Sequence, residues 1–167
     1  MIIASNILLL SGLSVAFWQD LKFRAIHWLV FALVFLISVS TVYFNEGISW
    51  RSMFMNMFFS TLVVVLLFLF LSLKNRVWTN AFKAHMGLGD YLFFLAVSPL
   101  FGQENFILFF ISGMFFAAII QPLLLFFLNR YENRTIPLAG LLSLYILLLK
   151  GLEYFSNWNP FTDSILL

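Results

Sequence analysis

Residues 53–73 read M-F-M-N-M-F-F-S-T-L-V-V-V-L-L-F-L-F-L-S-L and contain no charged side chain. A helix of about 20 mostly apolar residues is long enough to cross the hydrocarbon core of a bilayer. Similar apolar runs lie on both sides of this segment. The fold class predicted from them is all-α: a polytopic membrane protein with about six transmembrane helices, in a single domain over residues 1–167. The predicted helices span residues 2–19, 26–44, 53–73, 90–102, 106–128 and 136–150.

The composition supports the same class. Hydrophobic residues make up 63% of the chain and charged residues 10%, against roughly 45–50% and about 25% in soluble domains. A soluble fold of this length would expose much of that apolar surface to water, so membrane lipid is the expected surrounding. The net charge of +2 gives no indication of a nucleic acid partner.

Two residue types are too scarce for several kinds of chemistry. The chain has no cysteine, which excludes disulfides, a thiol nucleophile and cysteine-ligated metals. Its two histidines, His27 and His85, lie far apart in the sequence. We therefore expect neither a metal site nor a cofactor.

The basic residues indicate an orientation. Three polar links, residues 20–25, 74–87 and 129–135, contain seven of the nine lysines and arginines, and only Arg51 and Lys150 lie elsewhere. Because cytosolic loops are enriched in Lys and Arg, we expect these links in the cytosol and the N-terminus outside the cytoplasmic membrane. The first apolar run follows no basic stretch and has no small-residue cleavage site, so it is interpreted as a retained helix and not a signal peptide.

Two aspartates fall on the predicted cytosolic side. Asp20 ends the first predicted helix and Asp90 begins the fourth. Either aspartate alone is typical of a helix boundary. Two carboxyl groups that lie close together share a proton. One of them can then take a proton from water while the other protonates a peptide group. Gly87 and Gly89 precede Asp90 and lack a Cβ atom, which allows a sharp turn or close packing against another helix.

Three short motifs resemble those of the type IV prepilin peptidases, which include the archaeal preflagellin peptidases. Residues 86–90, M-G-L-G-D, are similar to the family's GxGD signature. Residues 20–26, D-L-K-F-R-A-I, keep its aspartate, arginine (Arg24) and isoleucine (Ile26) at matching spacing. Residues 135–139, T-I-P-L-A, resemble the motif around a proline, here Pro137, that opens the family's last helix. The resemblance covers residues 2–150 approximately.

The resemblance implies an aspartic-type endopeptidase of the plasma membrane with Asp20 and Asp90 as catalytic residues. The expected partner is a prepilin-like substrate with a hydrophobic N-terminal helix, whose leader peptide is cut at the cytosolic face during type IV pilus assembly or protein secretion. The cysteine-containing insertion of larger family members is missing, so no methyltransferase activity is expected.

Two other functions stay open at this point. His27, Leu92 and Leu138 stand where the family usually has proline, lysine and phenylalanine, which suggests an inactive relative that serves as an assembly subunit. The other is a small proton-coupled transporter that uses the two acids as a relay. Such a relay requires acids near the middle of the membrane.

Overall fold

The computed structural model describes residues 2–45, 49–75, 87–128, 137–155 and 161. All secondary structure in this part of the chain is helical, which confirms the predicted all-α class. The helices are α1 (Ile2–Phe23), α2 (Trp28–Asn45), α3 (Trp50–Asn75), α5 (Leu88–Val97), the short 3-10 helix η1 (Ser98–Leu100), α6 (Gln103–Leu128) and α7 (Leu138–Phe155).

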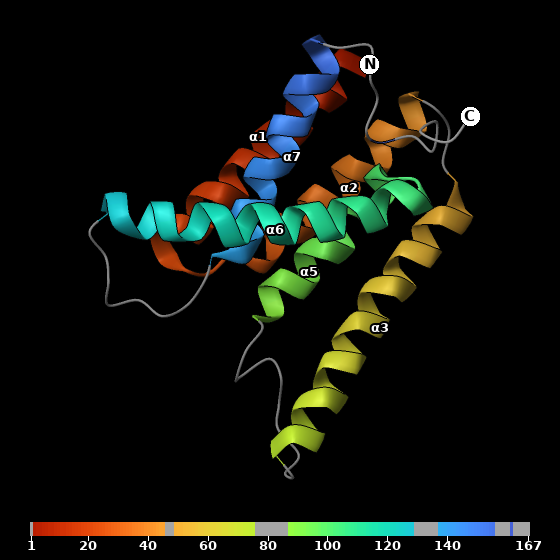
Figure 1. Cartoon of the computed structure of the whole chain (residues 1–167). Helices are drawn as coiled ribbons and strands as arrows, with labels where there is room; N and C mark the ends of the chain where they lie inside the picture. The colour runs from red at the N-terminus through yellow and green to blue at the C-terminus, as the bar shows by residue number, and fades with distance from the viewer. Residues whose placement is uncertain (1, 46–48, 76–86, 129–136, 156–160, 162–167) are drawn as a thin grey trace.

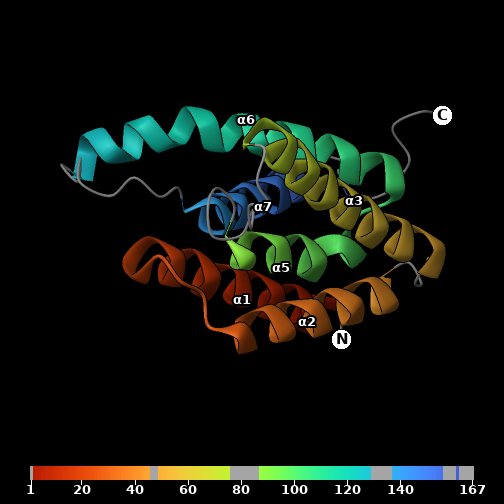
Figure 2. The ribbon, with the colours of Figure 1, turned by 90° about the horizontal axis from the view of Figure 1, so that it is seen from below.

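The first and last helices of the described chain pack against each other. α1 packs against α7 on one side and α2 on another (Figure 1). The short α5 lies against α2 and α3 and also contacts α7, while α6 crosses over α7 (Figures 1 and 2). This arrangement brings the C-terminal end of α1 and the N-terminal ends of α5 and α7 to the same end of the bundle.

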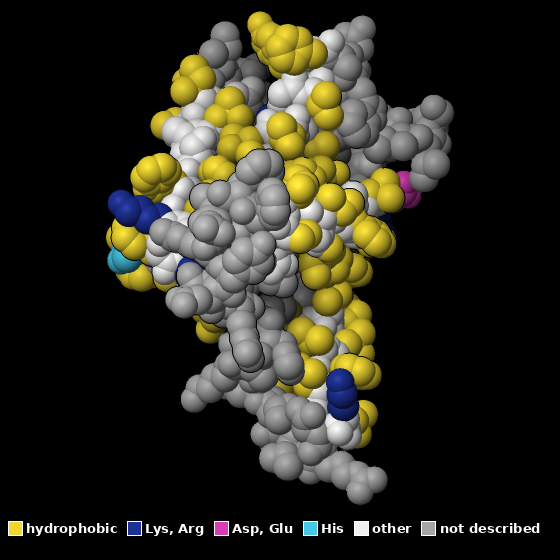
Figure 3. Space-filling view, turned by 60° about the vertical axis from the view of Figure 1, so that its left-hand side comes forward, with side chains coloured by type: hydrophobic (Ala, Val, Ile, Leu, Met, Phe, Trp, Pro, Cys, Tyr) yellow, Lys and Arg dark blue, Asp and Glu magenta, His cyan; other side chains and the backbone are white. Residues whose placement is uncertain are grey.

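The helices and their surface are those of a membrane protein. Among the residues that the structure describes, three helical segments are long and apolar enough to cross a bilayer: Trp50–Lys74, Gln103–Leu124 and Leu138–Phe155. Large apolar side chains such as Phe58 and Phe115 are more than half exposed, and hydrophobic side chains cover much of the described surface in Figure 3. Soluble monomers rarely expose apolar patches of this extent. The membrane class is therefore supported, and three helices in the described ranges have the length and composition of a membrane span.

Several predicted helix ends were wrong by a few residues. α1 continues to Phe23, beyond the predicted end at residue 19, so Asp20 lies in its last turn. The helix ends because Arg24 takes a left-handed conformation, with φ of 54°, while its N–H still donates to the Asp20 carbonyl at 3.0 Å. A helix that ends at the membrane surface can include polar residues, and hydropathy alone therefore placed this boundary too early.

The break between the fourth and fifth predicted helices lies earlier in the chain than expected. α5 ends at Val97 because Pro99 cannot continue an α-helix, and η1 takes its place. α6 then starts at Gln103, before the predicted start at residue 106, because the Gly102 carbonyl already accepts a hydrogen bond from the Phe106 N–H at 2.9 Å.

A buried asparagine holds α3 against this irregular segment. The side-chain amide of Asn56 is 1% exposed and donates to the carbonyls of Ser98, at 3.0 Å, and Phe101, at 2.8 Å. These carbonyls lie where the chain leaves helical geometry and would otherwise lack donors. Asn56 thereby fixes the C-terminal end of α5, the helix whose first turn carries Asp90.

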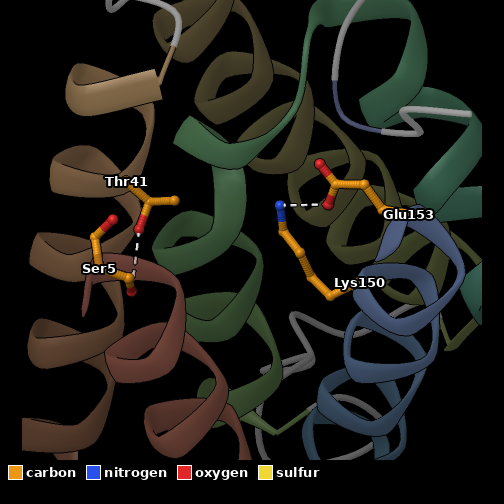
Figure 4. A network of polar contacts seen from close by, with 4 residues as sticks. All are labelled: Ser5, Thr41, Lys150 and Glu153. Carbon is orange, nitrogen blue, oxygen red and sulfur yellow. Dashed lines mark hydrogen bonds and ion pairs between the residues drawn. The ribbon is translucent and has the colours of Figure 1, made fainter. Parts of the chain in front are cut away.

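The opposite end of the bundle has its own polar contacts (Figure 4). Lys150 forms an ion pair with Glu153 at 2.7 Å and lies 4.0 Å from the ring centre of Phe161. Thr41 of α2 donates to the Ser5 carbonyl of α1 at 3.5 Å. Lys150 is one of the two basic residues that lie outside the predicted cytosolic links, and Glu153 balances its charge.

Candidate active site

Asp20 projects from the last turn of α1 toward the start of α7. Its side chain is buried, with 7% exposure, and its Oδ2 accepts a hydrogen bond from the Gly140 N–H at 2.6 Å. The charge of Arg24, one helical turn later, attracts this carboxylate. A buried carboxylate needs such partners, because burial without them is costly.

Asp90 lies in the first turn of α5 and accepts hydrogen bonds on both oxygens. Oδ2 accepts from the N–H of Gly87, the residue before the helix, at 3.1 Å, and Oδ1 accepts from the Ala139 N–H at 3.0 Å. The first contact caps the start of its own helix, where negative charge is favoured. The second contact reaches a residue 49 positions away.

The two aspartates therefore bind two consecutive backbone amides at the start of α7. Ala139 and Gly140 are neighbours in the first turn of α7, where backbone N–H groups have no acceptor within the helix. The Ala139 N–H binds Asp90 and the Gly140 N–H binds Asp20. The carboxyl groups are close enough for the charge of Asp20 to act on Asp90. Because two neighbouring ionised carboxylates repel each other, the pair favours a state in which one of them carries a proton.

Two further residues of the motifs, Pro137 and Ile26, have structural positions. Pro137 is buried directly before α7, a position where a missing N–H costs no helical hydrogen bond. Its carbonyl accepts from the Leu141 N–H at 3.0 Å. Ile26 is partly buried against the hydrophobic core in the link between α1 and α2. The structure thus brings Asp20, Asp90 and the residues after Pro137 together.

The two glycines before Asp90 have different surroundings. Gly87 has φ of −66° and ψ of 140°, an extended conformation that any residue adopts. The backbone therefore makes no sharp turn at Gly87 that requires glycine. Space is the constraint instead, because a Cβ on Gly87 would lie 3.2 Å from Oδ2 of Asp90. A Cβ on Gly89 would lie 3.5 Å from Cζ of Phe31 in α2, an ordinary contact between packed helices.

The sequence interpretation missed the residues of α7 that hold the aspartates. Ala139 ended the quoted motif without a role, and Gly140 lay just beyond it. A Cβ on Gly140 would come within 2.9 Å of the Asp20 Cβ. The sequence feature that could have indicated them is a glycine shortly after the proline that precedes a helix. The first turn of a helix presents N–H groups that have no acceptor within the helix.

His27 has a structural role that was not expected. Its Nδ1 accepts a hydrogen bond from the Leu29 N–H at 3.3 Å, and its own N–H donates to Oε1 of Gln19 at 3.0 Å. It therefore caps the start of α2 and ties that start to the end of α1. His85 lies outside the described residues. So do residues 76–86 of the second basic link and the whole of the third link, residues 129–135.

The described side chains do not form a cluster of three or more histidines or acids that would hold a metal ion. Acid–base chemistry is what a pair of neighbouring carboxyl groups supports. Comparisons with protein-family models, curated proteins and solved structures found no match to this chain.

Proposed function

We propose that this protein is a membrane-embedded aspartyl endopeptidase that cleaves the leader peptide of prepilin-like substrates. The observation that carries the proposal is the pair of hydrogen bonds from the adjacent Ala139 and Gly140 amides to Asp90 and Asp20. These bonds bring two acids from distant parts of the chain to one point. The three motifs that resemble the prepilin peptidases are the segments that meet there.

The proposed reaction uses one ionised and one protonated carboxyl group. The ionised group takes a proton from water as the water oxygen attacks the scissile carbonyl carbon, and the other group donates its proton to the carbonyl oxygen. Breakdown of the tetrahedral intermediate breaks the C–N bond, and the leaving amine takes up a proton from the pair. Asp90 is the more exposed of the two acids, and Gly87 beside it is exposed, so we propose that substrate approaches from the Asp90 side.

The proposed topology has six spans, with the N-terminus outside and both aspartates at the cytosolic face. Lys22 and Arg24 follow Asp20 directly, which supports this orientation under the positive-inside rule. The substrate would present a leader in the cytosol and a hydrophobic helix in the membrane. Because leader and enzyme loops are both basic, docking depends on apolar contact with that helix.

The proposal is tested by co-expressing a prepilin-like substrate with wild type, Asp20→Asn or Asp90→Asn. Asparagine keeps the shape and one acceptor oxygen for the α7 amides but cannot serve as an acid or base. We expect wild type to release the leader and both variants to accumulate uncut substrate at equal enzyme levels. Normal cleavage by either variant would show that the mechanism is wrong.

The second candidate is an inactive relative that acts as an assembly subunit for a pilus or secretion system. It is favoured by one observation: both aspartates bind backbone amides at a helix start, which is also what purely structural caps do. In that case the purified protein binds the substrate and never cleaves it. A proton-coupled transporter is less well supported, because both acids lie near helix ends and not midway along them.

A further inference from the structure

Gly140 is the residue of α7 in closest contact with a proposed catalytic group. Its N–H donates to Oδ2 of Asp20 at 2.6 Å, and the position of a Cβ on Gly140 would be 2.9 Å from Cβ and 3.0 Å from Oδ2 of Asp20. Real Cβ atoms essentially never approach another heavy atom so closely. The carboxylate therefore occupies the space that any other residue at position 140 would fill.

This contact cannot be relieved by a simple side-chain rotation. The nearest atom is the Asp20 Cβ, which is fixed to the backbone of α1, and α1 packs along α7. Gly113 offers a contrast, because a Cβ there would meet Cδ2 of Leu142, the far end of a flexible side chain. An added methyl group at position 140 must move either Asp20 or α1.

Movement of Asp20 would change its position relative to Asp90. Asp90 is also held by the Gly87 amide before its own helix, so it keeps a support outside α7 when Asp20 shifts. We propose that Gly140 is a positioning residue, which sets the distance between the two carboxyl groups by admitting Asp20 against the first turn of α7. The inference rests on the proposed function for its effect on catalysis, but the contact itself can be tested without activity.

The first experiment compares Gly140→Ala with Gly151→Ala in the cleavage assay. Gly151 lies on the same helix and a Cβ there would meet nothing within 4 Å, so this control gains a methyl group without a clash. For Gly140→Ala we expect kcat to fall about 100-fold, the cost of a misplacement of roughly 1 Å, with KM within about twofold of wild type. A loss that appears only in KM, or an equal loss in the control, overturns the proposal.

The second experiment is a double-mutant cycle read by thermal unfolding of the full chain in detergent. Gly140→Ala should lower the unfolding temperature in the wild-type background, although alanine is the better helix former. In an Asp20→Gly background, which removes the obstructing side chain, the same substitution should cause no loss. An equal loss of unfolding temperature in both backgrounds would show that the Asp20 side chain does not obstruct a Cβ at position 140.

The cycle remains decisive if Gly140→Ala fails to fold. Recovery of folded protein in the Asp20→Gly, Gly140→Ala double variant then supports the inference, and failure of the double variant to fold while Asp20→Gly folds overturns it. If wild type never cleaves substrate but the cycle shows the expected coupling, the proposed function is wrong and the role of Gly140 in seating Asp20 stands.

Discussion

The backbone amide of Gly140 donates a 2.6 Å hydrogen bond to Oδ2 of Asp20, a residue 120 positions earlier in the chain. This bond joins the last turn of the first helix to the first turn of the last one. The neighbouring amide, from Ala139, makes the equivalent bond to Asp90. One turn of α7 is therefore the common support of both acids, and changes in that turn or in the acids affect each other.

Asp90 should contribute to stability apart from any catalysis. Asp90→Ala removes the acceptors of the Gly87 and Ala139 amides, and we expect the free energy of unfolding to fall by about 1–2 kcal/mol, as for a lost helix cap. Asp90→Asn keeps an acceptor oxygen and should lose much less. Urea or thermal unfolding in detergent measures the difference. Equal stability of the two variants would contradict the observed bonds.

The two glycines of the M-G-L-G-D segment should respond differently to alanine. At position 87 the new Cβ would press on Oδ2 of Asp90 from 3.2 Å, whereas at position 89 it would make an ordinary 3.5 Å contact with Phe31. We expect Gly87→Ala to lower kcat about tenfold or more through a shifted carboxylate. Gly89→Ala should keep activity and gain roughly 0.5–1 kcal/mol of helix stability. A reversed order in the peptidase assay would refute this assignment.

Arg24 combines an unfavourable backbone conformation with a useful charge. A non-glycine residue at φ of 54° carries a cost of about 1–2 kcal/mol, which glycine avoids. Arg24→Gly should therefore be more stable than Arg24→Ala by about 1 kcal/mol, as measured by thermal unfolding. Both variants lose the charge that attracts Asp20 and should show reduced cleavage to a similar extent. Full activity in either variant would rule out an electrostatic role.

Asn56 should be needed for the junction between α5 and α6. Asn56→Ala leaves the buried Ser98 and Phe101 carbonyls without this donor, and we expect a loss of about 1–3 kcal/mol of unfolding free energy. Met55→Ala on the exposed face of the same helix is the control, because Met55 is 43% exposed. A loss no larger than that of the control would show that the asparagine is dispensable.

The proposed orientation can be checked with single cysteines, since the chain has none of its own. Phe23→Cys lies at the predicted cytosolic end of α1 and leaves Lys22 and Arg24 in place, while Ser49→Cys lies before α3 at the opposite end. In intact cells, a membrane-impermeant maleimide should label Ser49→Cys and leave Phe23→Cys unlabelled until the membrane is opened. The reverse pattern would contradict the positive-inside assignment, and labelling of both would contradict the paired spans of α1 and α2.

The class of this protein follows from its sequence because apolarity is a local property of each segment. The run at residues 53–73 is already long enough for a membrane helix, and the structure has α3 over it. The helix ends were less predictable, since they depend on single contacts such as the left-handed turn at Arg24 and the Gly102 carbonyl that starts α6. Hydropathy does not record such contacts.

The candidate site could likewise be predicted only in part from the sequence. Asp20 and Asp90 stand out in the sequence because charged residues are rare among apolar runs. What holds them does not stand out: the Ala139 and Gly140 amides, the space left by the missing Cβ of Gly140, and the Asn56 bonds that fix the far end of α5. These are contacts between distant parts of the chain, and backbone donors look alike in every sequence. Only the packing of α1, α5 and α7 decides which two amides the acids meet.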